Sequence, residues 1–299
     1  MPELPAVTVY VEALERHVSG RVLERARLAS VSLLRSVEPP LTAAEGRRVL
    51  GASRLGKRIV LSLEGELHLV FHLMIAGRLR WKKRGAAIPA KRAHAAFDFE
   101  NGTLLLTEAS TKKRATLHLV QGAEGLAAHD PGGLEVLGAD LAAFREALTR
   151  ESHTLKRALT DPALFSGIGN AYSDEILHRA RLSPLKLSLR LSDAEAAALF
   201  EATRAVLSEW TERLRREVGE GFPEKVTAYR PGMAVHGRYR EPCPDCGAPV
   251  QRIVHGESEF NYCARCQTGG RLLADRALSR LLREDWPRTL DELEARRRS

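Results

Sequence analysis

The first residues of the chain combine a potential nucleophile with a carboxylate. The sequence begins Met1-Pro2-Glu3-Leu4-Pro5, and an initiating Met in front of a small residue such as Pro is normally removed. Removal would leave Pro2 as a terminal secondary amine, and an α-amine, which titrates near pH ~8, is partly neutral and nucleophilic at pH 7. Such an amine converts a sugar C1′ into an iminium ion, and Glu3 is placed to move protons at that carbon. The alternative is a Met-Pro start without a chemical role.

Four clustered cysteines form a second candidate site. Cys243, Cys246, Cys263 and Cys266 make two Cys-x2-Cys pairs with sixteen residues between them. Each pair can present two thiolates to one ion, and four thiolates form a closed tetrahedral site, so we expect one structural zinc ion. An iron–sulfur cluster or free thiols are the alternatives. Clustered thiols in a chain without an export signal indicate metal ligands in a reducing compartment.

Two segments have residues suited to a phosphate backbone. Residues 166–170 read Ser-Gly-Ile-Gly-Asn, where glycines permit close backbone approach, the following helix N-terminus favours an anion, and Asn170 adds a donor. The segment between the cysteine pairs carries Arg252 and His255, and Arg265 and Arg271 lie close by. The alternatives are a tight turn capped by Asn170 and a zinc ribbon that binds protein.

Other candidates are single residues next to predicted strands. Lys57 precedes a strand, and the alternative for it is a solvated lysine. Met74 follows a strand and suits either a core position or a wedge between stacked bases. Residues 78–92 hold seven cations and no acid, which indicates a loop that faces an anion or an exposed charged loop. Asp174 and Glu175 read as ordinary acids on a helix surface.

Composition favours a polyanionic partner. The 299 residues carry a net charge of +8 and a pI of about 9.6, which favours nucleic acid over an acidic membrane. No run of about 18 apolar residues exists, so no membrane span is expected. The N-terminus lacks the charged and apolar regions of a secretory signal, so the sequence predicts a cytoplasmic, nucleoid-associated protein.

The pattern of apolar residues predicts a β-rich first part and a helical second part. A helix is expected over 5–19, followed by strands at 58–63, 67–71, 96–100, 103–107 and 116–120. Asn101-Gly102 marks a hairpin, and short strands joined by turns favour an antiparallel sandwich or barrel. Helices are expected at 141–150, 154–160, 170–181, from the Ser192–Glu195 capping box to about 218, and at 271–282 before a polar tail.

These elements divide the chain into five segments. The predicted organisation is a catalytic β-sandwich domain over 1–125, a linker over 126–137, a helical DNA-binding domain over 138–235, a four-cysteine zinc finger over 236–268, and a helical extension over 269–299.

Together these features resemble the formamidopyrimidine-DNA glycosylase and endonuclease VIII family of base-excision repair enzymes. The resemblance runs in consistent order from the Met1–Pro5 start, through Lys57, Met74 and Lys156, to Gly167-Ile-Gly-Asn170-x-Tyr-x-x-Glu175 and the cysteines, over about residues 1–268. It implies an α+β multidomain fold. The fold would contain an N-terminal antiparallel β-sandwich with a leading helix, a helical domain with a helix–two-turn–helix motif, and a zinc hairpin.

The resemblance also implies roles for individual residues. Pro2 attacks C1′ of a damaged nucleotide that is flipped out of the duplex, expels the base and forms a Schiff base. Glu3 acts as general acid and base, and β- and δ-elimination then nick the strand. Lys57 and Asn170 hold flanking phosphates, and Lys156 lines the lesion pocket or contacts the backbone. Met74 fills the gap left in the duplex, and Arg252 contacts DNA from the zinc hairpin.

The chain departs from the family pattern at three places. Ala6 replaces an acid that shapes the base pocket, so the usual preference for oxidised purines is in doubt. Residues 107–115 lack the Arg and Phe that fill the void and probe the opposite base. Ser258 occupies the place of the zinc-hairpin Arg, for which Arg252 is a possible substitute. About 30 residues also follow the zinc segment, where the family often stops.

The sequence therefore predicts a DNA glycosylase with abasic-site lyase activity and one structural zinc ion. We expect a monomer that acts on damaged DNA, whether duplex, single-stranded, open or cross-linked, with a relaxed preference for duplex. A non-catalytic protein that binds damaged DNA on the same scaffold is the main rival, supported by Ala6 and Ser258. An ordinary zinc-ribbon module of transcription or translation is the third reading, but it has no need of Glu3 behind a terminal Pro2.

Overall fold

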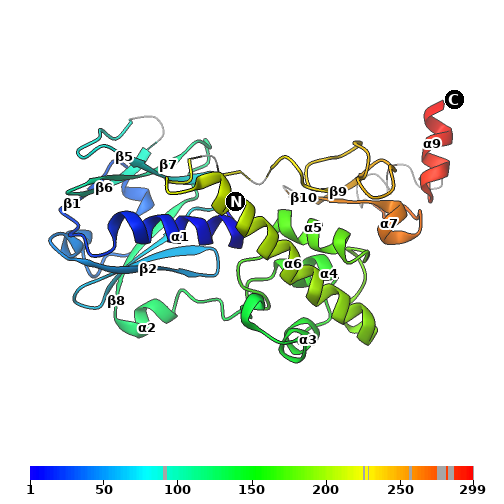
Figure 1. Cartoon of the computed structure of the whole chain (residues 1–299), viewed down its shortest axis with the longest axis horizontal. Coiled ribbons are helices and arrows are strands. Elements are labelled where there is room, and N and C mark those ends of the chain that lie inside the picture. The colour runs from blue at the N-terminus through cyan, green and yellow to red at the C-terminus, as the bar shows by residue number, and fades with distance from the viewer. Residues whose placement is uncertain are drawn as a thin grey trace. The chain divides into compact units, whose positions relative to one another are not determined.

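The chain folds into two units, each with a hydrophobic core of its own. The computed structural model describes residues 1–89, 93–224, 226–227, 229–255, 258–274, 281 and 286–298. The first unit comprises Met1–Gly132 and Glu209–Ala228, and the second comprises Gly133–Ser208 and Tyr229–Ser299. Helix α6 (Asp193–Val218) contributes residues to both units (Figure 1).

Helix α1 (Leu4–Val18) begins directly behind Glu3, as predicted. Pro5 stands in its first turn, where the missing N–H of proline leaves no intrahelical hydrogen bond unmade. The helix buries Val7, Tyr10 and Leu14 completely in the core of the first unit. The two residues proposed for chemistry therefore precede a helix that packing holds in place.

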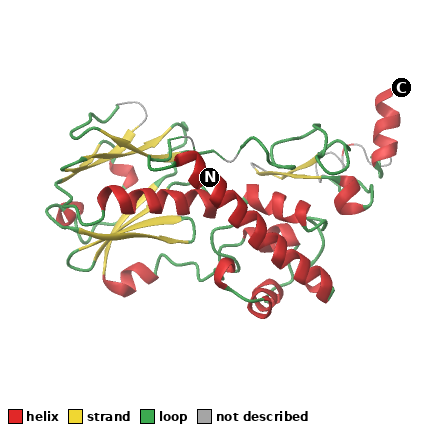
Figure 2. Cartoon of the chain, viewed as in Figure 1, coloured by secondary structure: helices red, strands yellow, loops and turns green. Residues whose placement is uncertain are grey.

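The first unit is an antiparallel β-sandwich. One sheet has the order β1-β6-β7-β5 and the other the order β2-β3-β4-β8. Figure 2 draws the strands in yellow. The T-shaped ring contact of Phe71 with Phe97, 5.2 Å between centroids, joins the inner faces of the two sheets. The strands are β1 (Arg25–Leu28), β2 (Val49–Leu55), β3 (Arg58–Leu63), β4 (Leu67–His72), β5 (Gly77–Lys82), β6 (Ala93–Phe99), β7 (Gly102–Glu108) and β8 (Thr116–Gln121).

The second unit combines helices with a two-stranded hairpin. Helices α4 and α5 form the helix–two-turn–helix motif, and β9 pairs antiparallel with β10. Gly167, between α4 and α5, has φ +77°, a conformation that favours glycine. The elements are α3 (Leu141–Thr149), α4 (Leu155–Thr160), α5 (Asn170–Arg179), β9 (Gln251–His255), β10 (Ser258–Tyr262), α7 (Ala264–Thr268) and α9 (Leu290–Arg298).

The expected elements agree with the structure in most places. The five predicted strands and the hairpin at Asn101 are present, and the capping box forms with Ser192 N–H donating to Glu195 at 2.9 Å and Glu195 N–H donating to Ser192 Oγ at 3.2 Å. Strands β1, β2 and β5 were not predicted. Their runs contain Gly or alternate Arg with apolar residues, so they lack a long apolar signal.

Two connecting segments differ in detail from the expected pattern. Helix α2 (Gly122–Ala127) extends into the expected linker. Residues 271–274 of the helix expected over 271–282 are not helical, since Arg271 forms a β-bridge with Thr289, while residues 275–280 and 282 lie outside the described residues. The expected polar tail instead contains α9, whose Leu290 is buried against the zinc hairpin.

The five-segment domain division stays a prediction. Among the described residues, no helix has both the length and the apolar character needed to cross a membrane.

Candidate functional site

The chain terminus lies among charged groups of the first unit. Pro2 and Glu3 are buried, and Glu3 is only 4% exposed. Burial lowers the pKa of the Met1 α-amine below its ordinary value of 8.0, Glu3 opposes that effect, and Arg78 and Lys57 reinforce it. A lowered pKa increases the neutral, nucleophilic fraction of an amine at neutral pH. The structure thus brings the terminus, Glu3 and Lys57 together.

Arg78 belongs to this site although the sequence marked it only as part of a basic segment. It stands on β5, and its Nε donates to the backbone oxygen of Val226 at 2.5 Å. Burial lowers the pKa of its guanidinium. The missed signal was the alternation of Arg78, Leu79 and Arg80, which is typical of a strand with one charged face.

Lys57 occupies the tight turn between β2 and β3. Gly56, just before it, has φ +60°, which a residue with a side chain rarely adopts. The positive charge of Lys57 also acts electrostatically on His72, at the end of β4. Burial lowers the pKa of His72 to about 4, and Arg58 and Lys57 contribute to this shift. Lys57 is therefore placed by the sandwich itself and not by a mobile loop.

We expect His72 to make the stability of the first unit depend on pH. Its pKa is about 4 in the folded chain and 6.5 ordinarily, so the unfolded chain binds the proton more tightly. The stabilisation is fully present above pH 6.5 and is lost as the pH falls towards 4, to a total of about 2–3 kcal/mol. Thermal unfolding of His72→Gln between pH 4 and 7.5 should show a flatter curve than wild type. An equally steep curve for both proteins would contradict this account.

Met74 adopts an unusual backbone conformation in the turn between β4 and β5. Its φ is +51°, a left-handed value that is uncommon for a residue with a side chain. The next residue, Ile75, is 56% exposed, so the turn presents apolar side chains to solvent. Backbone strain of this kind clusters at functional sites. The wedge role of Met74 stays a prediction, and Ile75 is an exposed apolar neighbour that the sequence did not mark.

The loop over 109–114, which lacks the Arg and Phe expected to fill the gap in the duplex, is held by one buried carboxylate. Glu108, at the end of β7, is 1% exposed and accepts the N–H groups of Arg114 at 2.9 Å and Ala115 at 3.3 Å. Lys113 Nζ donates to the backbone oxygen of Glu108 at 2.8 Å. The loop is thus ordered and cationic. Ala6, the other departure from the family pattern, is buried in the core of the same unit.

Lys156 is buried in the second unit beside the start of α5. Its ammonium donates to the backbone oxygen of Asn170 at 2.7 Å, to Ser173 Oγ at 2.8 Å and to the carboxylate of Asp174. Its side chain is 10% exposed. An ammonium has three protons, and these three acceptors use them. The DNA contact predicted for Lys156 stays a prediction, and the geometry favours a role in positioning Asn170.

Asp174 and Glu175 are not surface acids, and that prediction is wrong. Asp174 is 1% exposed and accepts from His236 Nδ1 at 2.7 Å and from Asn261 N–H at 3.1 Å. Glu175 is 5% exposed and accepts three backbone N–H groups, those of Ala234, Val235 and His236, at 2.6–2.9 Å. Both carboxylates therefore attach α5 to the segment that precedes the cysteines. Only tertiary packing brings these partners together.

We expect Glu175→Gln to destabilise the second unit by about 1.5–3 kcal/mol. The amide keeps one acceptor oxygen, so at least one buried N–H loses its charged partner. The matched control is Glu201→Gln on the exposed side of α6, which should change the free energy of unfolding by less than about 0.5 kcal/mol. Urea unfolding followed by circular dichroism measures both. Equal effects of the two substitutions would refute the anchoring role.

Asn170 connects α5 to the zinc hairpin. It is the first residue of α5, and its Nδ2 donates to the backbone oxygen of Glu259 on β10 at 2.5 Å. The hairpin is held on the same side by Asn261, whose Oδ1 accepts from Gly237 N–H at 2.8 Å. Asn170, Lys156 and the hairpin therefore form one connected group. The phosphate contact of Asn170 stays a prediction.

Arg252 is not a positional replacement for the missing hairpin arginine. The register pairs position 252 with Asn261 and position 258 with position 255. Because successive residues of a strand alternate between faces, positions 252 and 258 belong to opposite faces of the hairpin. Arg252 lies over the Tyr239 ring, 4.3 Å from its centroid, and donates to Glu259 at 3.2 Å. Its side chain is 44% exposed, so a DNA contact of its own stays a prediction.

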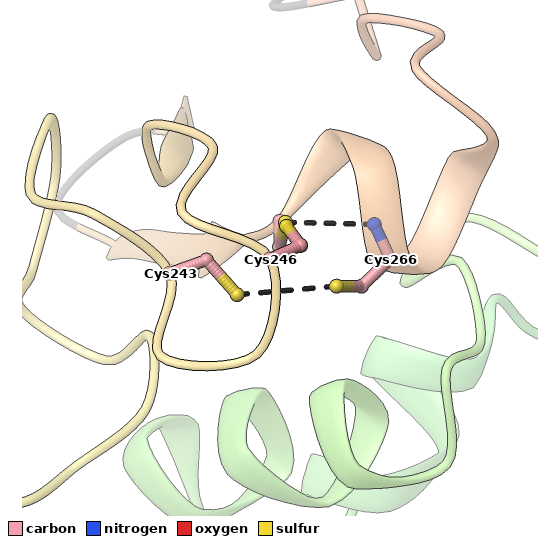
Figure 3. A group of neighbouring side chains, drawn as sticks. Cys243, Cys246 and Cys266 are labelled. Atoms are coloured by element: carbon pink, nitrogen blue, oxygen red, sulfur yellow. Dashed lines mark hydrogen bonds between the residues drawn. The ribbon is translucent and has the colours of Figure 1, made fainter.

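The four cysteines converge on one point. Figure 3 shows Cys243 and Cys246, which precede β9, facing Cys266 of α7. The sulfur atoms of Cys243 and Cys266 are 3.9 Å apart and those of Cys246 and Cys263 are 3.4 Å apart, and all four lie within 4.8 Å of one another. Zinc bound tetrahedrally at ~2.3 Å would separate its sulfur ligands by ~3.8 Å. The separations fit zinc and are too long for disulfides.

Known protein families match three segments of the chain between residues 1 and 269. The formamidopyrimidine-DNA glycosylase N-terminal domain matches residues 1–114, its H2TH domain matches 133–217, and the zinc finger found in FPG and IleRS matches 240–269. The sandwich, the helix–two-turn–helix motif and the four-cysteine hairpin together define a class of DNA repair glycosylases. The chain belongs to the formamidopyrimidine-DNA glycosylase and endonuclease VIII family, which confirms the predicted fold, the resemblance and a structural zinc site.

Individual relatives agree with this assignment. The formamidopyrimidine-DNA glycosylase of Heliobacterium modesticaldum is 32% identical over 282 residues, covering 89% of this chain and 100% of that protein. An uncharacterised formamidopyrimidine-DNA glycosylase-like protein of Mycobacterium tuberculosis is 43% identical over 153 residues, covering 51% of this chain and 93% of that protein. A Lactococcus lactis Fpg mutant bound to Fapy-dG-containing DNA has a TM-score of 0.77 at 25% identity, covering 89% of this chain and 100% of that one.

Proposed function

We propose that this chain is a bifunctional DNA glycosylase and abasic-site lyase that uses Pro2, freed by removal of Met1, as its nucleophile. The observation that carries the proposal is the setting of the terminus. With Met1 in place, burial lowers the pKa of the Met1 α-amine, and the cations of Lys57 and Arg78 act on that amine. Pro2, the next residue, is buried beside the buried carboxylate of Glu3, so an amine on Pro2 would lie in the same surroundings. A nucleophile with depressed pKa beside a general acid and base is the arrangement that covalent catalysis requires.

The proposed reaction proceeds through a covalent intermediate. The lone pair of the Pro2 nitrogen forms a bond to C1′ of an extruded nucleotide, and the C1′–base bond breaks with its electron pair leaving on the base. Opening of the sugar ring gives an iminium ion between Pro2 and C1′, with Glu3 moving protons at the sugar. Loss of a C2′ proton then expels the 3′ phosphate, and a further elimination expels the 5′ phosphate. Lys57 would hold a phosphate next to the reacting sugar.

The second unit supplies the remaining proposed DNA contacts. Asn170 and Arg252 would contact phosphates, and Lys156 would position Asn170 through the backbone hydrogen bond at 2.7 Å. We propose one zinc ion per chain, bound by the four cysteines, as the structural support of the hairpin. A monomer associated with nucleoid DNA is the proposed working form.

We propose a substrate range relaxed towards single-stranded, open or cross-linked DNA. Ala6 offers no polar group to a base pocket, because its side chain is a methyl group, and this methyl is buried in the core. The loop at 109–114 carries Lys112, Lys113 and Arg114 around Glu108 and has no aromatic residue to probe an opposite base. Cations bind a strand backbone without regard to the opposite base.

Borohydride trapping on an oligonucleotide with one abasic site tests the enzyme proposal. We expect a covalent protein–DNA adduct and a strand nicked on both sides of the site. Comparison of one lesion in single-stranded and duplex DNA tests the substrate range, and strong duplex preference with discrimination by the opposite base would contradict it. DNA binding without any adduct, in protein whose Met1 is removed, would instead support a non-catalytic protein that binds damaged DNA.

A further inference from the structure

His178 lies against the cysteine cluster although it belongs to a different element. It stands on α5, it is 4% exposed, and its Nε2 is 3.3 Å from the sulfur of Cys243, which is itself 2% exposed. Asp174 and Glu175 precede it by one helical turn and attach the same helix to residues 234–236 and 261. The contact is therefore set by the packing of α5 and not by a loop.

The chemistry of the pair favours a hydrogen bond from imidazole to thiolate. Four thiolates around a divalent cation leave a net charge of −2, and a buried charge needs donors around it. A thiolate sulfur that accepts a hydrogen bond from the ring selects the imidazole tautomer with hydrogen on Nε2. Cys263 accepts from the N–H of Cys266 within its own knuckle, at 3.5 Å. For Cys243 the side chain in the corresponding donor position is His178 of helix α5.

We propose that His178 is part of the metal centre as a positioning residue that donates Nε2–H to the Cys243 thiolate. This hydrogen bond holds the first cysteine pair against helix α5 and slows loss of zinc. Zinc occupancy is thereby connected to the helix that begins at Asn170. The inference concerns only the metal centre, so it does not depend on whether Pro2 is a nucleophile.

A different arrangement of the same residues would give His178 another role. His178, Asp245 and Cys266 also offer three ligand atoms within 4.8 Å of one another. In that case His178 would be a direct ligand, either of a second ion or in place of a cysteine. The experiment must therefore separate a hydrogen-bond donor from a ligand.

The test compares wild type with His178→Phe, His178→Gln and Asp245→Asn. Phe fills the space without a donor, Gln keeps a donor, and Asp245→Asn removes the carboxylate of the second ligand set. We expect one zinc per chain in all four proteins. Transfer of zinc to a chromogenic chelator should be about tenfold faster for His178→Phe, intermediate for His178→Gln and unchanged for Asp245→Asn.

Spectroscopy gives a readout that general destabilisation would not change. With cobalt in place of zinc, all variants should keep the absorption of a four-thiolate site. The thiolate-to-cobalt charge-transfer band should shift to lower energy only in His178→Phe. In wild type, ¹⁵N NMR should show hydrogen on Nε2 of His178. Unchanged zinc transfer and band position in His178→Phe, a second bound ion, or a bare Nε2 would each overturn the proposal.

Discussion

Pro2→Gly is expected to lower the yield of borohydride-trapped adduct by about 10²-fold, because a primary amine on a flexible glycine is no longer held in the attacking geometry. The substitution leaves Met1 removable and does not touch the buried face of α1. Glu3→Gln tests the partner group. It should slow base excision by about 10²–10⁴-fold while DNA binding stays within twofold of wild type.

A second substitution at Pro2 tests whether the position of the terminal amine matters. Pro2→Gln should block removal of Met1, so the terminal amine would belong to Met1 and stand one residue farther out. We expect no adduct from this variant and unchanged binding to an abasic duplex. Mass spectrometry of the intact proteins verifies the terminus in each case. Wild-type yields of adduct from both Pro2 variants would show that the nucleophile is elsewhere, and the proposed mechanism would be wrong.

Removal of zinc is expected to have the largest effect on the second unit. Structural zinc sites contribute about 10–16 kcal/mol of binding free energy, comparable with the whole stability of a domain. A chelator, or Cys266→Ser, should therefore unfold the hairpin of β9 and β10 and abolish tight DNA binding. Helix α9 and the segment around Leu272 should unfold with it, since Leu290 and Leu272 belong to the hydrophobic cluster that includes Cys243 and Cys263.

Proton competition gives an independent measurement of the same site. Burial raises the pKa of the Cys263 thiol to about 11 in the metal-free chain, so protons compete strongly for that sulfur atom. Zinc binding must displace those protons, and zinc affinity should fall as the pH falls from 8 to 6. Added zinc at pH 7.5 should restore the circular dichroism spectrum and DNA binding of chelated wild type but not of Cys266→Ser. Full folding and tight binding of the zinc-free chain would contradict a structural role for the metal.

Much of this protein is determined locally by its sequence. The pair Pro2-Glu3, the helix behind it and the strands over 58–63 and 116–120 follow from residue type and period. The Cys-x2-Cys pairs predict a metal site for the same reason, since two thiolates on one short turn need a cation and little else from the fold. These signals depend on neighbours a few residues away, so the sequence is sufficient to recognise them.

The tertiary structure decided which charged groups have structural roles. Asp174 and Glu175 look like surface acids in a helix, yet packing buries both because their partners come from residues 234–236 and 261. The ammonium of Lys156 pairs with the carboxylate of Asp174 on α5. His178 contacts Cys243, which lies sixty-five residues later in the sequence. The face of the hairpin on which Arg252 stands likewise depends on strand register. Local residue patterns do not specify such partners, because a buried charge is stable only where distant backbone donors and acceptors converge on it.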